Sequence, residues 1–172
     1  MWADPTVQGD FQNEPFQSST YPVTGSNGIL ALALNMEETR AMNRDLTSTP
    51  EGRQWLSSSR EGTSGFRFQL NLIGAEYTDA YSVDLVQIDQ GGGSETHIDD
   101  YNHAFYFLEG EGEVCIADER IATAPGVVIK IPAGVVHSVG NIGHAPLRFL
   151  TIYDPPRMRV AEVATGTYTE TR

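Results

Sequence analysis

The sequence has a single cysteine, a single lysine and no long apolar run, and each shortage excludes a class of structure. With only Cys115, no disulfide can form within the chain. No stretch approaches the roughly 20 apolar residues that a membrane-spanning helix requires. The first residues, MWADPTVQGDF, lack the basic start and apolar core of a signal peptide. We therefore expect a soluble, cytoplasmic protein without a membrane partner.

Basic residues are also scarce, because 11 Lys and Arg face 23 Asp and Glu, which gives a formal net charge of -12. Nucleic acids and anionic membrane surfaces both attract basic patches. The composition therefore argues against either as a partner, and we interpret the acidity as a source of solubility. At 172 residues, the chain has the length of one domain with an N-terminal extension.

Histidine is scarce too, yet three of the four histidines belong to one constellation centred on residues 91–112. His97 and Asp99 lie two residues apart, so in a strand both side chains would point to the same face. His103 has the same parity after a turn, and His137 follows on a separate segment. Imidazoles and a carboxylate that converge in this way suit a divalent transition metal.

This constellation resembles the first of the two sequence motifs of the cupin superfamily, G-x5-H-x-H-x3,4-E-x6-G. The spacing is matched by Gly91, His97, Asp99, His103 and Gly110. Two positions depart from the pattern, because Asp99 stands where the family has its second histidine and His103 where it often has glutamate. The spacing is also similar to that of small bacterial four-histidine cupins (HxHxxxH), from which only Asp99 differs.

The second cupin motif, G-x5-P-x-G-x2-H-x3-N, is present without departure. It is matched by Gly126, Pro132, Gly134, His137 and Asn141. The resemblance covers roughly residues 82–156 and implies a small jelly-roll (double-stranded β-helix) barrel with a metal inside. It does not fix the reaction, because cupins include dioxygenases, decarboxylases, isomerases, cyclases, lyases and proteins without catalysis.

The strand pattern agrees with an all-β barrel over residues 66–156. It begins with FRFQLNLI, in which apolar and polar residues alternate as in a half-buried antiparallel strand. Short apolar segments follow at regular spacing, separated by Gly, Pro, Asn and Asp, as far as Asp154-Pro155-Pro156.

The flanking segments have a different composition. Residues 1–65 are predicted to form an N-terminal arm with one or two short helices, at residues 35–46 and after a cap at Thr49. The apolar run at residues 28–34 is a candidate to cover an exposed sheet edge, within one subunit or in a homodimer, which we expect by analogy. Residues 157–172 are polar and threonine-rich, and we predict a mobile C-terminal tail.

The resemblance and the parity together predict four metal donors, which are three imidazoles and one carboxylate, at His97, Asp99, His103 and His137. A metal that accepts six donors would keep two positions for substrate or oxygen, as Fe, Mn, Co and Ni allow, whereas Zn prefers to stop at four. For Asp99 a role as second-shell acceptor or as a base beside the metal stays open. Asp100 is predicted to face away by parity, and His144 to face solvent.

By the same parity, apolar side chains are predicted to line a substrate pocket, namely Phe105, Phe107, Val135, Val139, Phe149 and Tyr153. The polar face of the FRFQLNLI strand, Arg67, Gln69 and Asn71, would turn either to solvent or into the cavity mouth, with solvent favoured for Arg67. Aromatic and aliphatic walls suit a small, partly apolar organic substrate.

Three functions follow from these features. The leading hypothesis is a metal-dependent enzyme, a dioxygenase-like oxidoreductase that binds a small substrate through two oxygens. The second is a non-redox cyclase, isomerase, decarboxylase or lyase that uses the metal as a Lewis acid, with Asp99 as a base. The third is a barrel that binds a small molecule without catalysis, which the lack of a second acid–base residue in the motifs favours.

Overall fold

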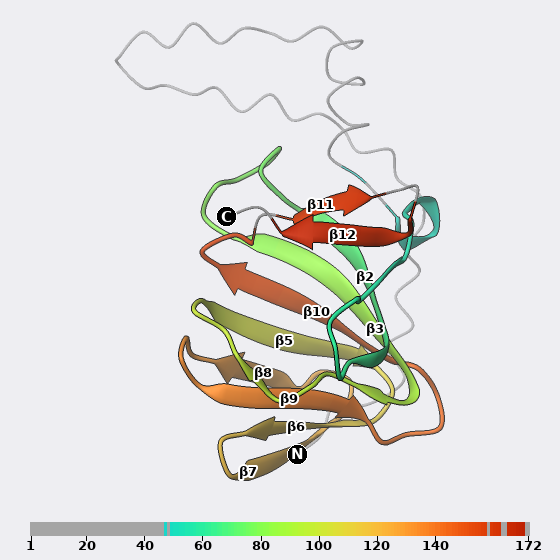
Figure 1. Cartoon of the computed structure of the whole chain (residues 1–172), viewed down its shortest axis with the longest axis vertical. Helices are drawn as coiled ribbons and strands as arrows, with labels where there is room; N and C mark the ends of the chain where they lie inside the picture. The colour runs from blue at the N-terminus through green and yellow to red at the C-terminus, as the bar shows by residue number, and fades with distance from the viewer. Residues whose placement is uncertain (1–46, 48, 158, 163–164, 171–172) are drawn as a thin grey trace, which may run out of the picture.

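The computed structural model describes residues 47, 49–157, 159–162 and 165–170, which form an all-β structure (Figure 1). The elements are one 3-10 turn, η1 (Pro50–Gly52), and the strands β1 (Leu56–Ser57), β2 (Ser64–Ile73), β3 (Ser82–Gly93), β4 (His97–Ile98), β5 (Asn102–Glu109), β6 (Gly112–Ile116), β7 (Glu119–Thr123), β8 (Val128–Ile131), β9 (Val136–Asn141), β10 (Leu147–Asp154), β11 (Arg159–Glu162) and β12 (Thr167–Glu170). Among these described elements, no helix has the length and apolar character needed to cross a membrane.

Strands that are distant in the sequence lie next to one another in the main sheet. Its order is β7-β6-β9-β3-β10-β5-β8, with β2 added along β3, β1 along β2 and β4 along β9. All of these pairs are antiparallel, and β10 lies between β3 and β5 (Figure 1). The order pairs β4, from the first motif, with β9, from the second. Although β3 and β10 separate β5 from β9 in the sheet, the rings of His103 on β5 and His137 on β9 have centroids only 4.8 Å apart.

The core fills one end of the barrel and leaves the other end to the histidines. On the inward face of β5, His103, Phe105 and Phe107 follow one another at a spacing of two residues. Phe107 is paired with Phe149 of β10, and both are completely buried. The ring centroids of Phe105 and Phe149 are 4.8 Å apart, so the phenylalanines close the floor beneath His103.

The segment before the barrel is not the α-helix that its capping residues predict. Only the 3-10 turn η1 forms, and β1 follows it, with Leu56 buried against β2. The Gln69 amide donates to the carbonyls of Pro50 and Arg53, and Arg53 donates to two carbonyls of β2. These long-range hydrogen bonds outweigh a weak helix preference.

The same hydrogen bonds decide the position of Gln69 on the polar face of β2. Its side chain is buried against the 3-10 turn and does not face solvent. Asn71, which we expected to face either solvent or the cavity mouth, is half-buried. The helix predicted at residues 35–46 and the apolar run at 28–34 lie outside the described residues.

Part of the predicted C-terminal tail forms an antiparallel hairpin, β11–β12. Tyr168 of β12 packs its ring against Phe68, with the centroids 5.4 Å apart. Arg159 of β11 is buried and forms an ion pair with the equally buried Asp84 of β3. The backbone N–H of Ser57 also donates to Gly166 between the two strands. The hairpin therefore belongs to the packed structure, in contrast to the tail that the polar composition predicts.

Candidate metal centre

Strand register brings two of the predicted donors face to face. His97 of β4 lies directly opposite His137 of β9, and their ring centroids are 4.3 Å apart. The turn that delivers His137 is attached to the first motif, because Gly134 donates its N–H to the Asp99 carbonyl at 2.8 Å. Gly134 has φ +79°, a conformation that glycine adopts without strain. The two motifs are thus joined by backbone contacts at the point where their side chains meet.

Asp99 lies at the centre of the three histidines. Its Oδ2 atom is 3.5 Å from Nε2 of His97, 3.8 Å from Nε2 of His137 and 4.0 Å from Nδ1 of His103. The structure therefore brings all four predicted donors together. His97, Asp99 and His137 form the tighter group, with one ligand atom from each within 4.8 Å of the others. The His103 ring flanks this group, with its centroid 4.8 Å from that of His137.

Backbone carbonyls set the orientation of the two paired imidazoles. Nδ1 of His97 lies 2.9 Å from the Glu95 carbonyl, and Nδ1 of His137 lies 2.9 Å from the Val135 carbonyl. Because a carbonyl only accepts, we assign the proton of each neutral ring to Nδ1, which leaves a lone pair on Nε2. Both Nε2 atoms then face the Asp99 carboxylate. Nε2 of His137 is buried and has no hydrogen-bond partner among the described residues. Lone pairs and a carboxylate that face one another fit a bound cation.

Three of the four pKa shifts favour the forms that bind a metal, and that of His97 favours a proton. Burial raises the pKa of Asp99, but its hydrogen bond with His97 and the nearby charges of His97 and Arg157 outweigh burial and hold it well below its usual value. Burial and the neighbouring His137 lower the pKa of His103 to about 4. Burial also lowers the pKa of His137. At neutral pH these groups are therefore an ionised carboxylate and two neutral imidazoles, the forms that bind metals.

The pKa of His97 is raised. Burial lowers it, but hydrogen bonds with Asp99 and the Glu95 carbonyl have the larger combined effect. The hydrogen bond with Asp99 requires a proton on Nε2 of His97, and this proton competes with a metal for the lone pair of the neutral ring.

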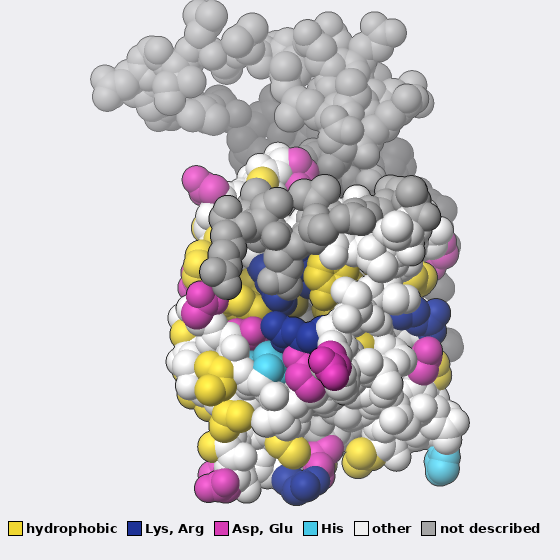
Figure 2. Space-filling view, viewed as in Figure 1, with side chains coloured by type: hydrophobic (Ala, Val, Ile, Leu, Met, Phe, Trp, Pro, Cys, Tyr) yellow, Lys and Arg dark blue, Asp and Glu magenta, His cyan; other side chains and the backbone are white. Residues whose placement is uncertain are grey.

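A cavity of about 530 Å³, measured with its open mouth, begins at these side chains. Three of the six predicted pocket residues line it, namely Phe105, Val139 and Tyr153. Phe107 and Phe149 instead lie in the closed core, and Val135 precedes β9 in the turn, outside the lining. On the face shown in Figure 2, a histidine side chain meets basic and acidic side chains. The cavity is thus apolar on one wall and charged near the donors, a lining that suits a small, partly apolar molecule.

Residues 84–153, which contain all four donors, match the Cupin domain family. The chain contains a cupin domain. A stretch of 52 residues is 36% identical to an uncharacterised protein from Methanocaldococcus jannaschii. This stretch covers 30% of this chain and 42% of that protein. The chain therefore spans less than half of the length of this curated relative.

Solved structures agree with the cupin fold. The polyketide cyclase RemF from Streptomyces resistomycificus is similar with a TM-score of 0.58 and 20% identity, over 63% of this chain and 78% of that one. A predicted oxalate decarboxylase from Thermotoga maritima gives a TM-score of 0.57 and 20% identity, over 63% and 98% of the two chains. At this level of identity, the likeness establishes the fold and no particular activity.

The cupin site also contains polar residues that the motifs did not predict. The Glu95 side chain lines the cavity and is held by the Thr63 hydroxyl, which donates to it, and by Arg60, whose Nη1 lies 3.0 Å from its Oε1. Its sequence position gave a signal, because Glu95 precedes His97 by two residues and shares its parity. Arg157 also lines the cavity. The sequence gave no signal for this role, because the residue follows two prolines in the predicted tail. Asp100 and His144 are exposed, as their sequence positions predict.

The lowered pKa of His103 predicts acid sensitivity of the metal-free cupin domain. Below pH 6.5 the unfolded chain binds a proton at this residue that the folded protein excludes down to about pH 4. The free energy of unfolding should therefore fall as the pH drops through this range, by up to about 3 kcal/mol. The raised pKa of His97 acts with the opposite sign, so the comparison needs a variant. Urea unfolding with a chelator present should show a smaller loss between pH 7 and pH 4.5 for His103→Gln than for the wild type. Equal losses would contradict this origin of the acid sensitivity.

Proposed function

We propose that this cupin domain is a mononuclear non-haem metal enzyme, an oxygenase that acts on a small organic substrate. One observation supports this proposal most directly: the Nε2 atoms of two oriented imidazoles and an ionised carboxylate face one another in the lining of a cavity. Two histidines and one carboxylate with open positions form the donor set of non-haem Fe(II) oxygenases.

In this proposal His97, Asp99 and His137 hold the metal. When bound, a redox-active divalent metal would supply Lewis acidity towards substrate oxygens and electrons for dioxygen. The carbonyls of Glu95 and Val135 keep the two rings in a fixed tautomer and orientation. The Phe105 and Val139 side chains exclude water from the inner wall of the cavity and contact the apolar part of the substrate.

A second candidate function rests on the position of His103. Its ring is close enough to the other donors to complete a set of three imidazoles and one carboxylate. Three imidazoles suffice to hold zinc, which has no redox chemistry, and they leave its fourth position open for substrate. A domain that selects zinc would therefore use the site for cyclisation, isomerisation, decarboxylation or lyase chemistry, without oxygen.

Metal selection and oxygen uptake distinguish these candidates. The purified protein would first be analysed for its metal and then loaded anaerobically with Fe(II) or with Zn(II). A panel of small diketones, catechols and hydroxy-ketones would be tested with an oxygen electrode and by mass spectrometry. We expect oxygen consumption with Fe(II) only, and its loss in an Asp99→Asn variant. Turnover of a substrate by the zinc form without oxygen would favour the second candidate. A folded protein that takes up neither metal would contradict both and leave a non-catalytic binding barrel.

A further inference from the structure

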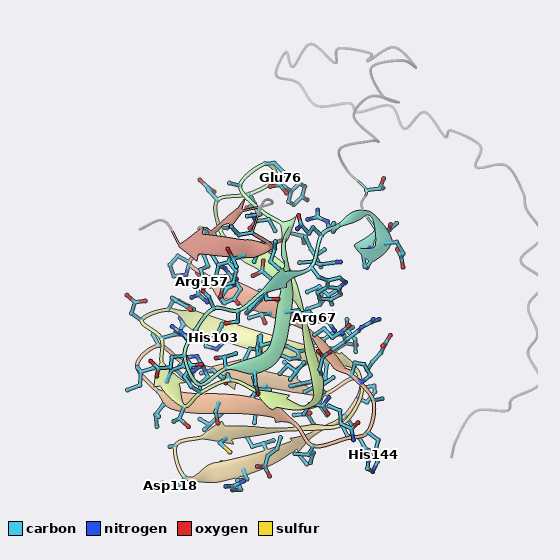
Figure 3. All side chains as sticks on the ribbon, turned by 45° about the vertical axis from the view of Figure 1, so that its right-hand side comes forward. Arg67, Glu76, His103, Asp118, His144 and Arg157 are labelled. Carbon is cyan, nitrogen blue, oxygen red and sulfur yellow. The ribbon has the colours of Figure 1, made fainter. Side chains whose placement is uncertain are left out.

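Arg157 occupies a fixed position in the wall of the cavity. It follows the two prolines after β10, and its backbone N–H donates to the Ser82 hydroxyl at 2.9 Å. Its guanidinium carbon lies 5.1 Å from the ring centroid of Tyr101 and 5.7 Å from that of Tyr153. Figure 3 shows Arg157 near His103 on one side of the barrel, with His144 at the far end. The side chain is therefore placed by both its backbone and its aromatic neighbours.

The guanidinium of Arg157 is therefore held beside two aromatic rings, where it can recognise a planar anion. Its N–H donors lie in the plane of the group and match the two oxygens of a carboxylate. Arg157 lines the same cavity as Asp99 and His103, and it is close enough to stabilise the negative charge of Asp99. A ligand that approaches the metal donors therefore passes within reach of this arginine.

The charges around the cavity favour an anion once a metal is bound. Two arginines, Arg60 and Arg157, balance the two carboxylates of Glu95 and Asp99, and Arg60 forms an ion pair with Glu95. A divalent cation at the donors would leave this region with an excess of positive charge. The chain as a whole carries a formal charge of -12, so the cavity would stand out as the place that attracts anions.

One wall of the cavity is apolar. It is formed by the aromatic and aliphatic side chains of Phe66, Phe68, Val86, Phe105 and Val139. We propose that the substrate is a small carboxylic acid with an apolar body, and that Arg157 binds its carboxylate while the apolar wall contacts the rest. The proposal rests on the metal-dependent function argued above and specifies the class of its substrate.

A pair of probes that differ only in charge tests this assignment. We would titrate the zinc-loaded protein with 3-phenylpropionate and with the neutral 3-phenylpropionamide by isothermal calorimetry. We expect the wild type to bind the acid more tightly than the amide. In Arg157→Gln the affinity for the acid should fall at least about tenfold, the effect of a lost charged hydrogen bond, while the amide is little affected. Arg157→Lys, which keeps the charge but loses the planar donors, should lie between the two.

The matched control is Arg120→Gln, which removes the same charge from an exposed arginine of β7 that lies outside this cavity. It should keep the preference for the acid. If Arg157→Gln keeps this preference, or if only Arg60→Gln loses it, the assignment to Arg157 is wrong. A wild type that does not distinguish the probes would overturn it as well. Zinc content and thermal unfolding, measured for each variant, keep this result separate from the proposed function, which fails if the wild type binds no metal.

Discussion

A His137→Ala variant should lose its metal. The imidazole is buried, its Nδ1–H is held by the Val135 carbonyl, and its Nε2 atom faces Asp99 without another partner among the described residues. Even residues that only orient a metal ligand cost about 10- to 100-fold in affinity when they are mutated, so the loss of a ligand should cost at least about 100-fold. Titration with Zn(II) or Co(II), followed by elemental analysis after dialysis, measures this change directly.

Two further variants separate metal binding from folding. His137→Gln keeps a polar side chain of similar size but presents an amide in place of the imidazole nitrogen, so it should also lose the metal. His144→Ala removes the exposed histidine of the loop before β10 and should retain full metal content. Circular dichroism would show that all three variants are folded. Full metal content in folded His137→Ala would disprove the site.

Local spacing was enough to predict three of the four donors, because the geometry of a strand is regular. Residues two apart on a strand share a face, so the sequence alone predicts His97 beside Asp99, with Asp100 on the other face. The distance of 3.5 Å between Nε2 of His97 and Oδ2 of Asp99 agrees with a shared face. His137 could be predicted only through its motif, because its pairing opposite His97 is a contact between distant segments.

The flanking segments show where local patterns fail. Thr49, Pro50 and Glu51 have the order of a helix start, yet hydrogen bonds from Gln69 and to β2 hold this segment as a 3-10 turn and a strand. The hairpin β11–β12 has few apolar residues, so nothing local predicts a packed structure. Its position depends on partners in β2 and β3, and such contacts depend on the whole fold.

The buried pair between Asp84 and Arg159 leads to the prediction with the largest effect on stability. Both side chains are 1% exposed, and the pair joins β3 of the barrel to β11 of the hairpin. The Arg159 guanidinium also lies over the rings of Phe68, Tyr153 and Tyr168, at 4.9–5.4 Å from their centroids. Removal of one partner of a buried pair leaves the other charge without compensation in a poor solvent for charges. We therefore expect Asp84→Ala to lower the free energy of unfolding by about 3–5 kcal/mol.

Two comparisons test whether the loss comes from the buried charge. The Oδ1 atom of Asp84 accepts the backbone N–H of Asn71 at 2.7 Å, and Asp84→Asn can keep this hydrogen bond while it removes the charge. It should therefore be less destabilising than Asp84→Ala, though still well below the wild type in stability. Glu113→Ala, which breaks the solvent-exposed pair with Arg120, should cost less than about 1 kcal/mol because water replaces the partner. Urea unfolding of the three variants gives these differences, and a similarly small cost for Asp84→Ala would mean that the ion pair does not hold the hairpin on the cupin barrel.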